Sequence, residues 1–380
     1  MIDSDKATAR LLVADDQPDV LEALRLLLSQ HDFSLHLVTS PGAVLDRVRA
    51  ERWDAVLMDL NYSRDTTSGA EGLSLLAQLR AEYHDLPIVV MTAWGNIELA
   101  VEAMRAGAQS FVQKPWDNRE LVQILEREVA DGRGVRQRSE HFAREQHDAL
   151  MIQRALMPPA LPITQRFEVV GAWQPAGTLG GDCYDAFTFS PDVIGLSIAD
   201  VAGKGLPAAL LMSSLQAALR AFASEASPPE TVCASVNRLL CGQMIAGRFV
   251  TMAYLRLDAA RGRLVYANAG HNPPLLAHND GRVEALTSSG TVLGVFADAE
   301  YGSSEVALRS GDRLLLYTDG ITEARDEAGE EFGQERLQAA LLRHRHLAAG
   351  ELHRAVMSDV TRFAVGGFED DATLLAVAVV

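Results

Sequence analysis

Residues 180–205 read GGDCYDAFTFSPDVIGLSIADVAGKG and decide the fold of the second half of the chain. The run Val193–Ile198 is too short for a helix and rich in β-branched residues, so it predicts a strand. Asp182 and Asp200 then lie at the ends of adjacent strands. Carboxylates held at strand ends beside Gly-rich turns are typical of sites for hard divalent cations, with coordination positions left open for water.

Two further acidic turns follow downstream. Asp319 ends the run LYTDG, and Asp370 and Asp371 precede the apolar run that closes the chain. Each Asp-containing turn after a strand is, taken alone, most simply a turn. Because several occur in one segment, we interpret them together as a metal site.

Residues 167–380 resemble the metal-dependent PP2C-like serine/threonine phosphatases, in the branch of bacterial stress and sporulation regulators. The motifs that carry the resemblance are GGDCYD, ADVAGKG, YANAGHNPP, LYTDGITEA and DDATLL. The resemblance implies an α+β domain, a β-sandwich flanked by helices. It also implies hydrolysis of phosphomonoesters with two Mn²⁺ or Mg²⁺ ions.

The same resemblance assigns roles to individual residues. Asp200 corresponds to the carboxylate that bridges the two metals, and Val201 contributes its carbonyl oxygen. Asp319 and Asp370 complete the shell of one ion, which makes Asp200, Asp319 and Asp370 the expected catalytic carboxylates. Asp182 lies near the other ion, directly or through water.

Three residues near these motifs have less defined roles. Asp371, the second acid of the DD pair, is expected to be supportive or structural. His271 in AGHNPP is either a structural histidine or a general acid, and a lone histidine between a strand and a turn favours the first. Lys204 opens a helix and is a weaker candidate for contacting phosphate.

The cysteines do not support a cysteine-based phosphatase. Such a site needs Cys followed after five residues by Arg, whereas four residues separate Cys233 from Arg238 and six separate Cys241 from Arg248. With Cys183, the three cysteines form no disulfide or metal pattern. This usage indicates a reducing, cytoplasmic environment.

Composition narrows the possible partners. A chain of 380 residues is long for one core and predicts two or three domains. The net charge of −17 disfavours a nucleic-acid partner, because binding a polyanion depends on Lys and Arg. The polar N-terminus and the lack of any apolar run near ~20 residues predict a soluble protein without a membrane anchor.

The first half of the chain alternates apolar runs with amphipathic segments. This alternation predicts a doubly wound (βα)₅ α/β domain with a parallel sheet. The working residues of such sheets collect beyond the carboxyl ends of the strands. The expected strands are 11–14, 34–38, 55–58, 88–91 and 110–112.

Five polar residues directly follow these strands, and this half resembles the receiver domain of two-component response regulators. Asp15 and Asp16 in VADDQ would hold Mg²⁺, and Asp59 in VLMDL would be the phosphoacceptor and also a ligand. Thr92 in VMTA corresponds to the switch hydroxyl and Lys114 in QKPW to the charge partner. A cluster of three carboxylates is costly without a cation, which agrees with a bound Mg²⁺.

The resemblance extends to three further features. Asn61 would lend its backbone carbonyl to the metal, and the Lys114-Pro115 bond is expected to be cis. Phe111 corresponds to the aromatic that rotates with the switch hydroxyl, although a strand phenylalanine is more often core. The loop 61–69 is longer and more polar than usual and reads as a surface loop or a partner-recognition loop.

The segment between the two halves is charged and reads as a helical linker. Gly132 and Gly134 interrupt its heptad pattern, so a coiled coil would be broken, and Pro158 ends the helix. The expected domains are a receiver at 1–120, the linker at 121–157 and the phosphatase at 158–380. The linker is either a solvated single helix or a weak homodimer contact.

Together these features predict a response regulator whose Asp59 is phosphorylated by a sensor histidine kinase and which controls a phosphoserine/phosphothreonine phosphatase. The resemblance further implies a phosphorylated anti-sigma-factor antagonist as the substrate. The alternative is an adaptor whose phosphatase fold has lost its chemistry. The retained acids at 182, 200, 319 and 370 disfavour it.

Overall fold

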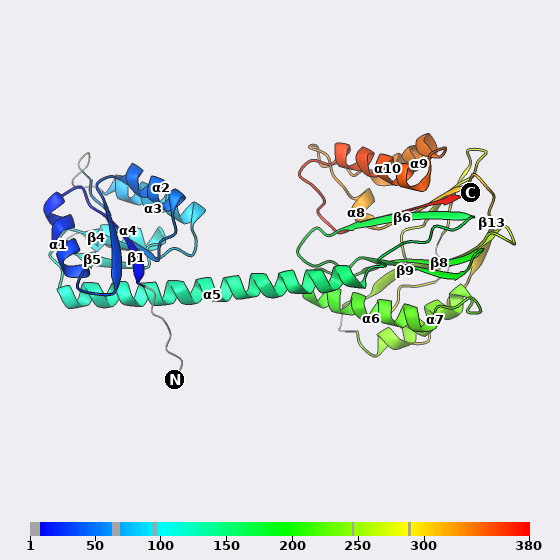
Figure 1. Cartoon of the computed structure of the whole chain (residues 1–380), viewed down its shortest axis with the longest axis horizontal. Helices are drawn as coiled ribbons and strands as arrows, with labels where there is room; N and C mark the ends of the chain where they lie inside the picture. Colours follow the sequence, from blue (N-terminus) through cyan, green and yellow to red (C-terminus); the bar gives the residue numbers. More distant parts are fainter. Residues whose placement is uncertain (1–7, 63–68, 94–96, 245–246, 288–289) are drawn as a thin grey trace. The chain divides into compact units, whose positions relative to one another are not determined.

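The computed structural model describes residues 8–62, 69–93, 97–244, 247–287 and 290–380. The chain divides into two compact units, Met1–Arg144 and Glu145–Val380 (Figure 1). Most of the loop 61–69 lies outside the described residues. Among the helices that the described residues form, none combines the length and the apolar composition needed to cross a bilayer.

The first unit is a five-stranded parallel sheet in the order β2-β1-β3-β4-β5. Its strands are β1 Ala9–Ala14, β2 Phe33–Val38, β3 Ala55–Asp59, β4 Ile88–Thr92 and β5 Ser110–Gln113. Its helices are α1 Pro18–Leu28, α2 Pro41–Ala50, α3 Ala70–Glu82 and α4 Ile97–Arg105, together with the first part of α5. The expected doubly wound fold is confirmed.

The two faces of this sheet bury alternate residues of the same strands. Leu57 packs with residues of α1 and α5. Met58, the next residue of β3, packs on the other face with α2, α3 and α4. Every residue of β3 is buried, as a central parallel strand covered on both faces requires.

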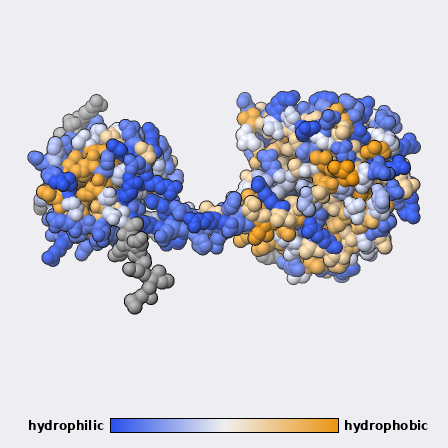
Figure 2. Space-filling model, in the orientation of Figure 1, coloured by the Kyte–Doolittle hydropathy of each residue, from blue (hydrophilic) through white to orange (hydrophobic). Residues whose placement is uncertain are grey.

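Helix α5 spans Asn118–Leu156 without a break. Gly132 and Gly134 interrupt its heptad pattern but not its helix. Residues 137–145 are all exposed, and the middle of α5 is mostly hydrophilic (Figure 2), with Phe142 as an exposed apolar side chain. Tertiary contacts therefore stabilise the two ends of α5 rather than its middle.

The second unit contains two antiparallel sheets, in the orders β13-β10-β9-β8-β7 and β12-β11-β14-β15-β6. The longer strands are β6 Phe167–Gln174, β7 Cys183–Ser190, β8 Val193–Val201, β9 Val250–Asp258, β10 Arg263–Ala269, β14 Arg313–Tyr317 and β15 Ala372–Val379. The short strands are β11 Leu275–Ala277, β12 Val283–Ala285 and β13 Ser304–Ala307. These short strands were not expected, because three or four residues are too few to show alternation.

Helices cover both outer faces of this sandwich, as Figure 1 shows. Helices α6 Leu206–Phe222 and α7 Pro229–Cys241 contact the sheet that contains β8 and β9. Helices α9 Gly333–His344 and α10 Ala349–Phe363 contact the other sheet, and the short α8 Asp319–Thr322 follows β14. The expected β-sandwich flanked by helices is confirmed.

Candidate functional sites

The first site lies at the carboxyl ends of β1 and β3. Asp15 and Asp59 are buried, and ligand oxygens of Asp15, Asp16 and Asp59 lie within 4.8 Å of one another. Lys114 follows β5 and places its Nζ 2.6 Å from Asp15 Oδ2 and 2.9 Å from Asp59 Oδ2. The structure thus brings together three acids and one ammonium group that are up to 99 positions apart in the chain.

These residues fit a divalent cation. Asp16 Oδ1, Asp59 Oδ1 and Asn61 Oδ1 are buried and make no hydrogen bond. Burial raises the pKa of Asp59, and the hydrogen bond from Lys114 opposes that rise without cancelling it. Buried oxygens without donors are costly unless a cation or a ligand satisfies them.

The residues expected to respond to phosphorylation lie on β4 and β5 or directly after them. Thr92 is the last residue of β4 and is buried, and its carbonyl oxygen accepts the N–H of Lys114 at 2.8 Å. Phe111 is 46% exposed, so it is a surface aromatic rather than core. The Lys114-Pro115 bond is cis, as expected. Tyr62, which no sequence motif marks, is buried beside the acids, and burial and their charges raise its pKa.

The second site lies where β8, β14 and β15 meet their turns. Asp200 is the penultimate residue of β8, Asp319 opens α8, and Asp370 lies just before β15. Burial and the neighbouring carboxylates, Asp319 foremost, raise the pKa of Asp200 to about 7. Burial and the charge of Asp370 likewise raise the pKa of Asp319. Asp200, Asp319 and Asp370 therefore lie near enough to one another to interact electrostatically.

These acids are arranged more loosely than those of the receiver. Within the described parts of the chain, the group Asp15, Asp16 and Asp59 meets the 4.8 Å spacing, and no group of three from the second half does. Lys204 lies among the latter acids instead. Its Nζ donates to the carbonyl oxygen of Glu369 at 2.8 Å and is 3.1 Å from Asp370 Oδ2. This ammonium group partly neutralises the cluster.

Asp182 is held by two hydroxyl groups. Its Oδ2 accepts hydrogen bonds from Thr318 Oγ1 at 2.7 Å and from Thr373 Oγ1 at 2.6 Å. The carboxylate is almost fully buried, and burial, with the charge of Asp200, raises its pKa. Both threonines stand inside the motifs LYTDG and DDATLL, but nothing in the sequence alone showed that they converge on Asp182.

Asp371 holds the loop that leads to Asp182. Its Oδ1 accepts the N–H of Ala176 at 2.9 Å, and its Oδ2 accepts the N–H of Gly181 at 2.6 Å. A Cβ on Gly181 would lie 2.7 Å from the carbonyl oxygen of Val201. Only glycine leaves that carbonyl accessible next to Asp200.

The end of α5 reaches the same loop. Gln153 is buried, its Nε2 donates to the carbonyl oxygen of Gly180 at 2.6 Å, and its Oε1 accepts the Gly180 N–H at 3.2 Å. The side chain thus pairs with both backbone groups of a residue two positions before Asp182. The sequence does not predict this pairing, because a glutamine among the charged residues of a helix is not unusual.

His271 and the cysteines take no direct part in the acid cluster. His271 is buried, its Nδ1 lies 2.8 Å from Thr251 Oγ1, and burial lowers its pKa to about 4. A neutral buried imidazole fits the structural interpretation. The cysteines are all unpaired, and burial raises the pKa of Cys233 to about 12 and that of Cys183 as well.

The oxygen ligands of the second site fit Mn²⁺ or Mg²⁺. Carboxylates and a backbone carbonyl are the donors that such hard cations prefer. The raised pKa values of Asp200 and Asp319 come from burial and from like charges, and a bound cation would reverse the second effect.

Two protein families match this chain. The profile of "Stage II sporulation protein E (SpoIIE)" matches residues 190–380, and that of the "Response regulator receiver domain" matches residues 11–126. The second match covers the receiver-like unit from β1 into α5, and the first covers the sandwich from the last residue of β7 onward, without β6 and Asp182.

Individual relatives agree. The chain is 30% identical over 228 residues to the phosphoserine phosphatase RsbU of Bacillus subtilis, covering 60% of this chain and 68% of RsbU. It is 29% identical over 254 residues to protein IcfG of Synechocystis sp., covering 60% of this chain but only 40% of IcfG. The SiaA-PP2C domain of Pseudomonas aeruginosa has the same fold, with a TM-score of 0.56, 23% identity and coverage of 63% of this chain and 98% of that domain.

Proposed function

The chain belongs to the SpoIIE family of PP2C-like phosphatases and begins with a response regulator receiver domain, and from this membership we propose that it is a phosphorylation-controlled protein phosphatase. The reaction is hydrolysis of phosphoserine or phosphothreonine. The observation that carries the proposal is the grouping of Asp200, Asp319 and Asp370 at the turns that follow β8 and β14 and precede β15, where burial, and then the charges of Asp319 and Asp370, raise the pKa of Asp200 to about 7.

In the receiver, Asp59 accepts a phosphoryl group from the phosphohistidine of a sensor histidine kinase. The P–N bond of the donor breaks, and a P–O bond forms to the Asp59 carboxylate. Asp15, Asp16, Asp59 and Asn61 would hold Mg²⁺, which supplies positive charge to the transferring phosphoryl group. The Lys114 ammonium adds charge on the same side, 2.9 Å from Asp59 Oδ2.

In the phosphatase, Asp182, Asp200, Asp319 and Asp370 and the carbonyl oxygen of Val201 would hold the metals. Two Mn²⁺ or Mg²⁺ ions, when bound, lower the pKa of water and stabilise the charge of an in-line displacement on phosphorus. Thr318 and Thr373 fix the rotamer of Asp182, and Asp371 fixes the backbone of Gly181. These supporting residues keep the ligands in place before any ion binds.

The substrate we propose is a phosphorylated anti-sigma-factor antagonist, which the resemblance of the sequence motifs to bacterial stress and sporulation regulators implies. The similarity to the phosphoserine phosphatase RsbU supports phosphoserine as the group that is hydrolysed. We place the protein in the cytoplasm, which suits its three unpaired cysteines. Val135 and Phe142, seven residues apart on α5, are 41% and 60% exposed and would contribute to a homodimer contact. The adaptor alternative gains no support, because every expected ligand acid is retained.

The test is hydrolysis of a serine-phosphorylated protein by the full chain with and without Mn²⁺. We expect Asp200→Asn to lower kcat by about 100-fold or more, because the bridging charge is lost. Asp192→Asn is the matched control, since this half-exposed aspartate precedes the other end of β8. Activity in EDTA equal to that in Mn²⁺, or a parent rate in Asp200→Asn, would contradict the proposal.

A further inference from the structure

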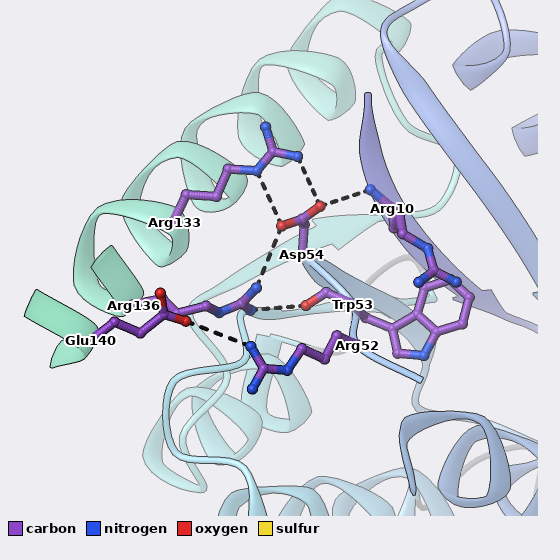
Figure 3. Close-up of polar contacts among 7 residues, drawn as sticks. All are labelled: Arg10, Arg52, Trp53, Asp54, Arg133, Arg136 and Glu140. Carbon is purple, nitrogen blue, oxygen red and sulfur yellow. Dashed lines mark hydrogen bonds and ion pairs between the residues drawn. The ribbon is translucent and has the colours of Figure 1, made fainter. Parts of the chain in front are cut away.

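Helix α5 is fastened to the receiver at the end of the sheet opposite the acids. Asp54 immediately precedes β3, and its side chain is only 13% exposed. Arg133 of α5 donates to both carboxylate oxygens, through Nε at 3.1 Å and Nη2 at 2.9 Å (Figure 3). The N–H of Arg10 in β1 donates to Asp54 Oδ2 at 2.9 Å. One carboxylate therefore joins α5 to β1 and β3.

Arg136, one turn further along α5, adds to this joint. Its Nη2 donates to the carbonyl oxygen of Trp53 at 3.0 Å, and its Nη1 lies 3.7 Å from Asp54 Oδ1. Figure 3 shows both arginines reaching from α5 toward the segment before β3. Although burial acts to raise the pKa of Asp54, the hydrogen bonds from Arg133 and Arg10 outweigh it and lower that pKa. The carboxylate is thus held in its charged form.

A close backbone approach completes the joint. A Cβ built on Gly132 would lie 2.4 Å from Cγ of Pro87, which immediately precedes β4. No side chain larger than hydrogen fits there without displacing the helix or the proline. A Cβ on Gly134 would instead meet nothing nearer than the flexible Arg138 guanidinium at 3.5 Å. The two glycines therefore differ in the contact they make, not in their place in the helix.

The joint and the phosphorylation site occupy opposite ends of the same three strands. β1 runs from the Arg10 contact to Asp15, β3 from Asp54 to Asp59, and β4 from Pro87 to Thr92. All residues of β3 and β4 are buried, so neither strand has free space in which to deform. The packed backbone of β3 and β4 therefore connects the end of the sheet with Asp59 and Thr92 to the residues that contact α5.

We propose that Asp54, Gly132, Arg133 and Arg136 form the joint through which the phosphorylation state of Asp59 acts on helix α5. The output it would control rests on the proposed phosphatase function. The bidentate pair of Arg133 with Asp54 and the contact of Gly132 with Pro87 both depend on the position of α5 relative to the strands, to within about a few tenths of an ångström. A small shift of β3 or β4 then changes the free energy of the docked helix, which is what a switch requires.

The experiment compares Gly132→Ala with Gly134→Ala in the full chain, with Asp54→Asn as a second perturbation. Both alanines gain the same helix propensity, so any difference between them reports the contact with Pro87. The first readout is hydrogen exchange of α5 amides with and without beryllofluoride and Mg²⁺. The second is the rate with para-nitrophenyl phosphate and Mn²⁺ under the same conditions. Fluorine NMR of bound beryllofluoride checks that each receiver is folded.

We expect beryllofluoride to change exchange at residues 130–140 in the parent and in Gly134→Ala. In Gly132→Ala and Asp54→Asn we expect exchange there to be about tenfold faster, with the response of both readouts to beryllofluoride lost. The proposal would be overturned if both variants showed the same α5 exchange and the same response to beryllofluoride as the parent. It would also be overturned if beryllofluoride did not change the exchange of α5 in the parent. Faster exchange with an unchanged phosphatase response would also overturn it. If the parent has no phosphatase activity, only the proposed function is contradicted. The hydrogen exchange of α5 still tests the joint in that case.

Discussion

Asp370 and Asp371 are adjacent acids for which we expect different roles. Asp371 is 6% exposed and accepts two backbone N–H groups of a loop far away in sequence. The Asp370 side chain is 40% exposed, accepts the N–H of its neighbour Asp371 at 2.8 Å and lies beside Lys204. We expect substitution of Asp371 to cost stability and substitution of Asp370 to cost metal binding. Comparing substitutions at the two positions therefore tests whether Asp371 is a structural carboxylate and Asp370 a metal ligand.

The magnitudes follow from the contacts. A hydrogen bond to a charged group contributes about 1.5–3 kcal/mol, so Asp371→Ala, which removes two, should lower the free energy of unfolding by ~3–6 kcal/mol. Asp371→Asn keeps one acceptor oxygen and should cost about half as much. Asp370→Asn loses one exposed ion pair, worth at most about 1 kcal/mol, and relieves repulsion with Asp200 and Asp319. Its net effect should stay within ~1 kcal/mol of zero.

The assay is urea unfolding of the full chain in EDTA, with the transition of the phosphatase unit followed separately, and calorimetric titration with Mn²⁺. We expect Asp371→Asn to unfold at lower urea and Asp370→Asn to unfold like the parent but bind Mn²⁺ weakly. Equal losses of stability in the two variants would refute the assignment. So would a larger loss in Asp370→Asn.

Two further predictions concern the receiver and the buried histidine. Asp59→Asn should abolish labelling by acetyl phosphate, because an amide cannot form the acyl phosphate; stoichiometric labelling of the variant would identify another acceptor. The pKa of His271 falls from its ordinary 6.5 to about 4 in the folded state, so the unfolded chain takes up this proton first as pH falls. The contribution of neutral His271 to the free energy of unfolding is therefore complete above pH ~6.5. It declines as the pH falls toward 4, by up to about 3 kcal/mol. The difference in unfolding free energy between the parent and His271→Gln should change by that amount between pH 7 and pH 4. A difference that does not depend on pH would show that His271 does not titrate in this way.

The features that could be predicted from the sequence are those encoded locally. The buried strands of the receiver read as apolar runs, and Asp15, Asp59 and Thr92 directly follow them, so strand order alone brings these residues to one edge. The phosphatase acids were recognised because each stands inside a distinctive motif. In both cases the signal lies within about ten consecutive residues.

The supporting contacts could not be predicted in this way. The Thr373 hydroxyl reaches Asp182 across 191 positions, and Arg133 reaches Asp54 across 79. Neither threonine nor arginine is unusual at its own position, so no local pattern marks the pair. The glycines of α5 were interpreted as interruptions of a heptad, whereas Gly132 is required by its contact with Pro87. Such contacts depend on the assembled fold rather than on periodicity.

The pairing of Gln153 with Gly180 also bears on how such a protein could have been assembled from separate genes. Cutting the chain at Pro158 would remove Gln153 and leave the Gly180 N–H and carbonyl groups without these partners. Buried backbone groups without partners are strongly disfavoured, so a phosphatase taken from another protein must bring the end of its preceding helix with it. A recombination joint is better tolerated within residues 137–145, where every side chain is exposed. Exchange of input domains during evolution is therefore expected to break the chain inside the helix rather than at the prolines that follow it.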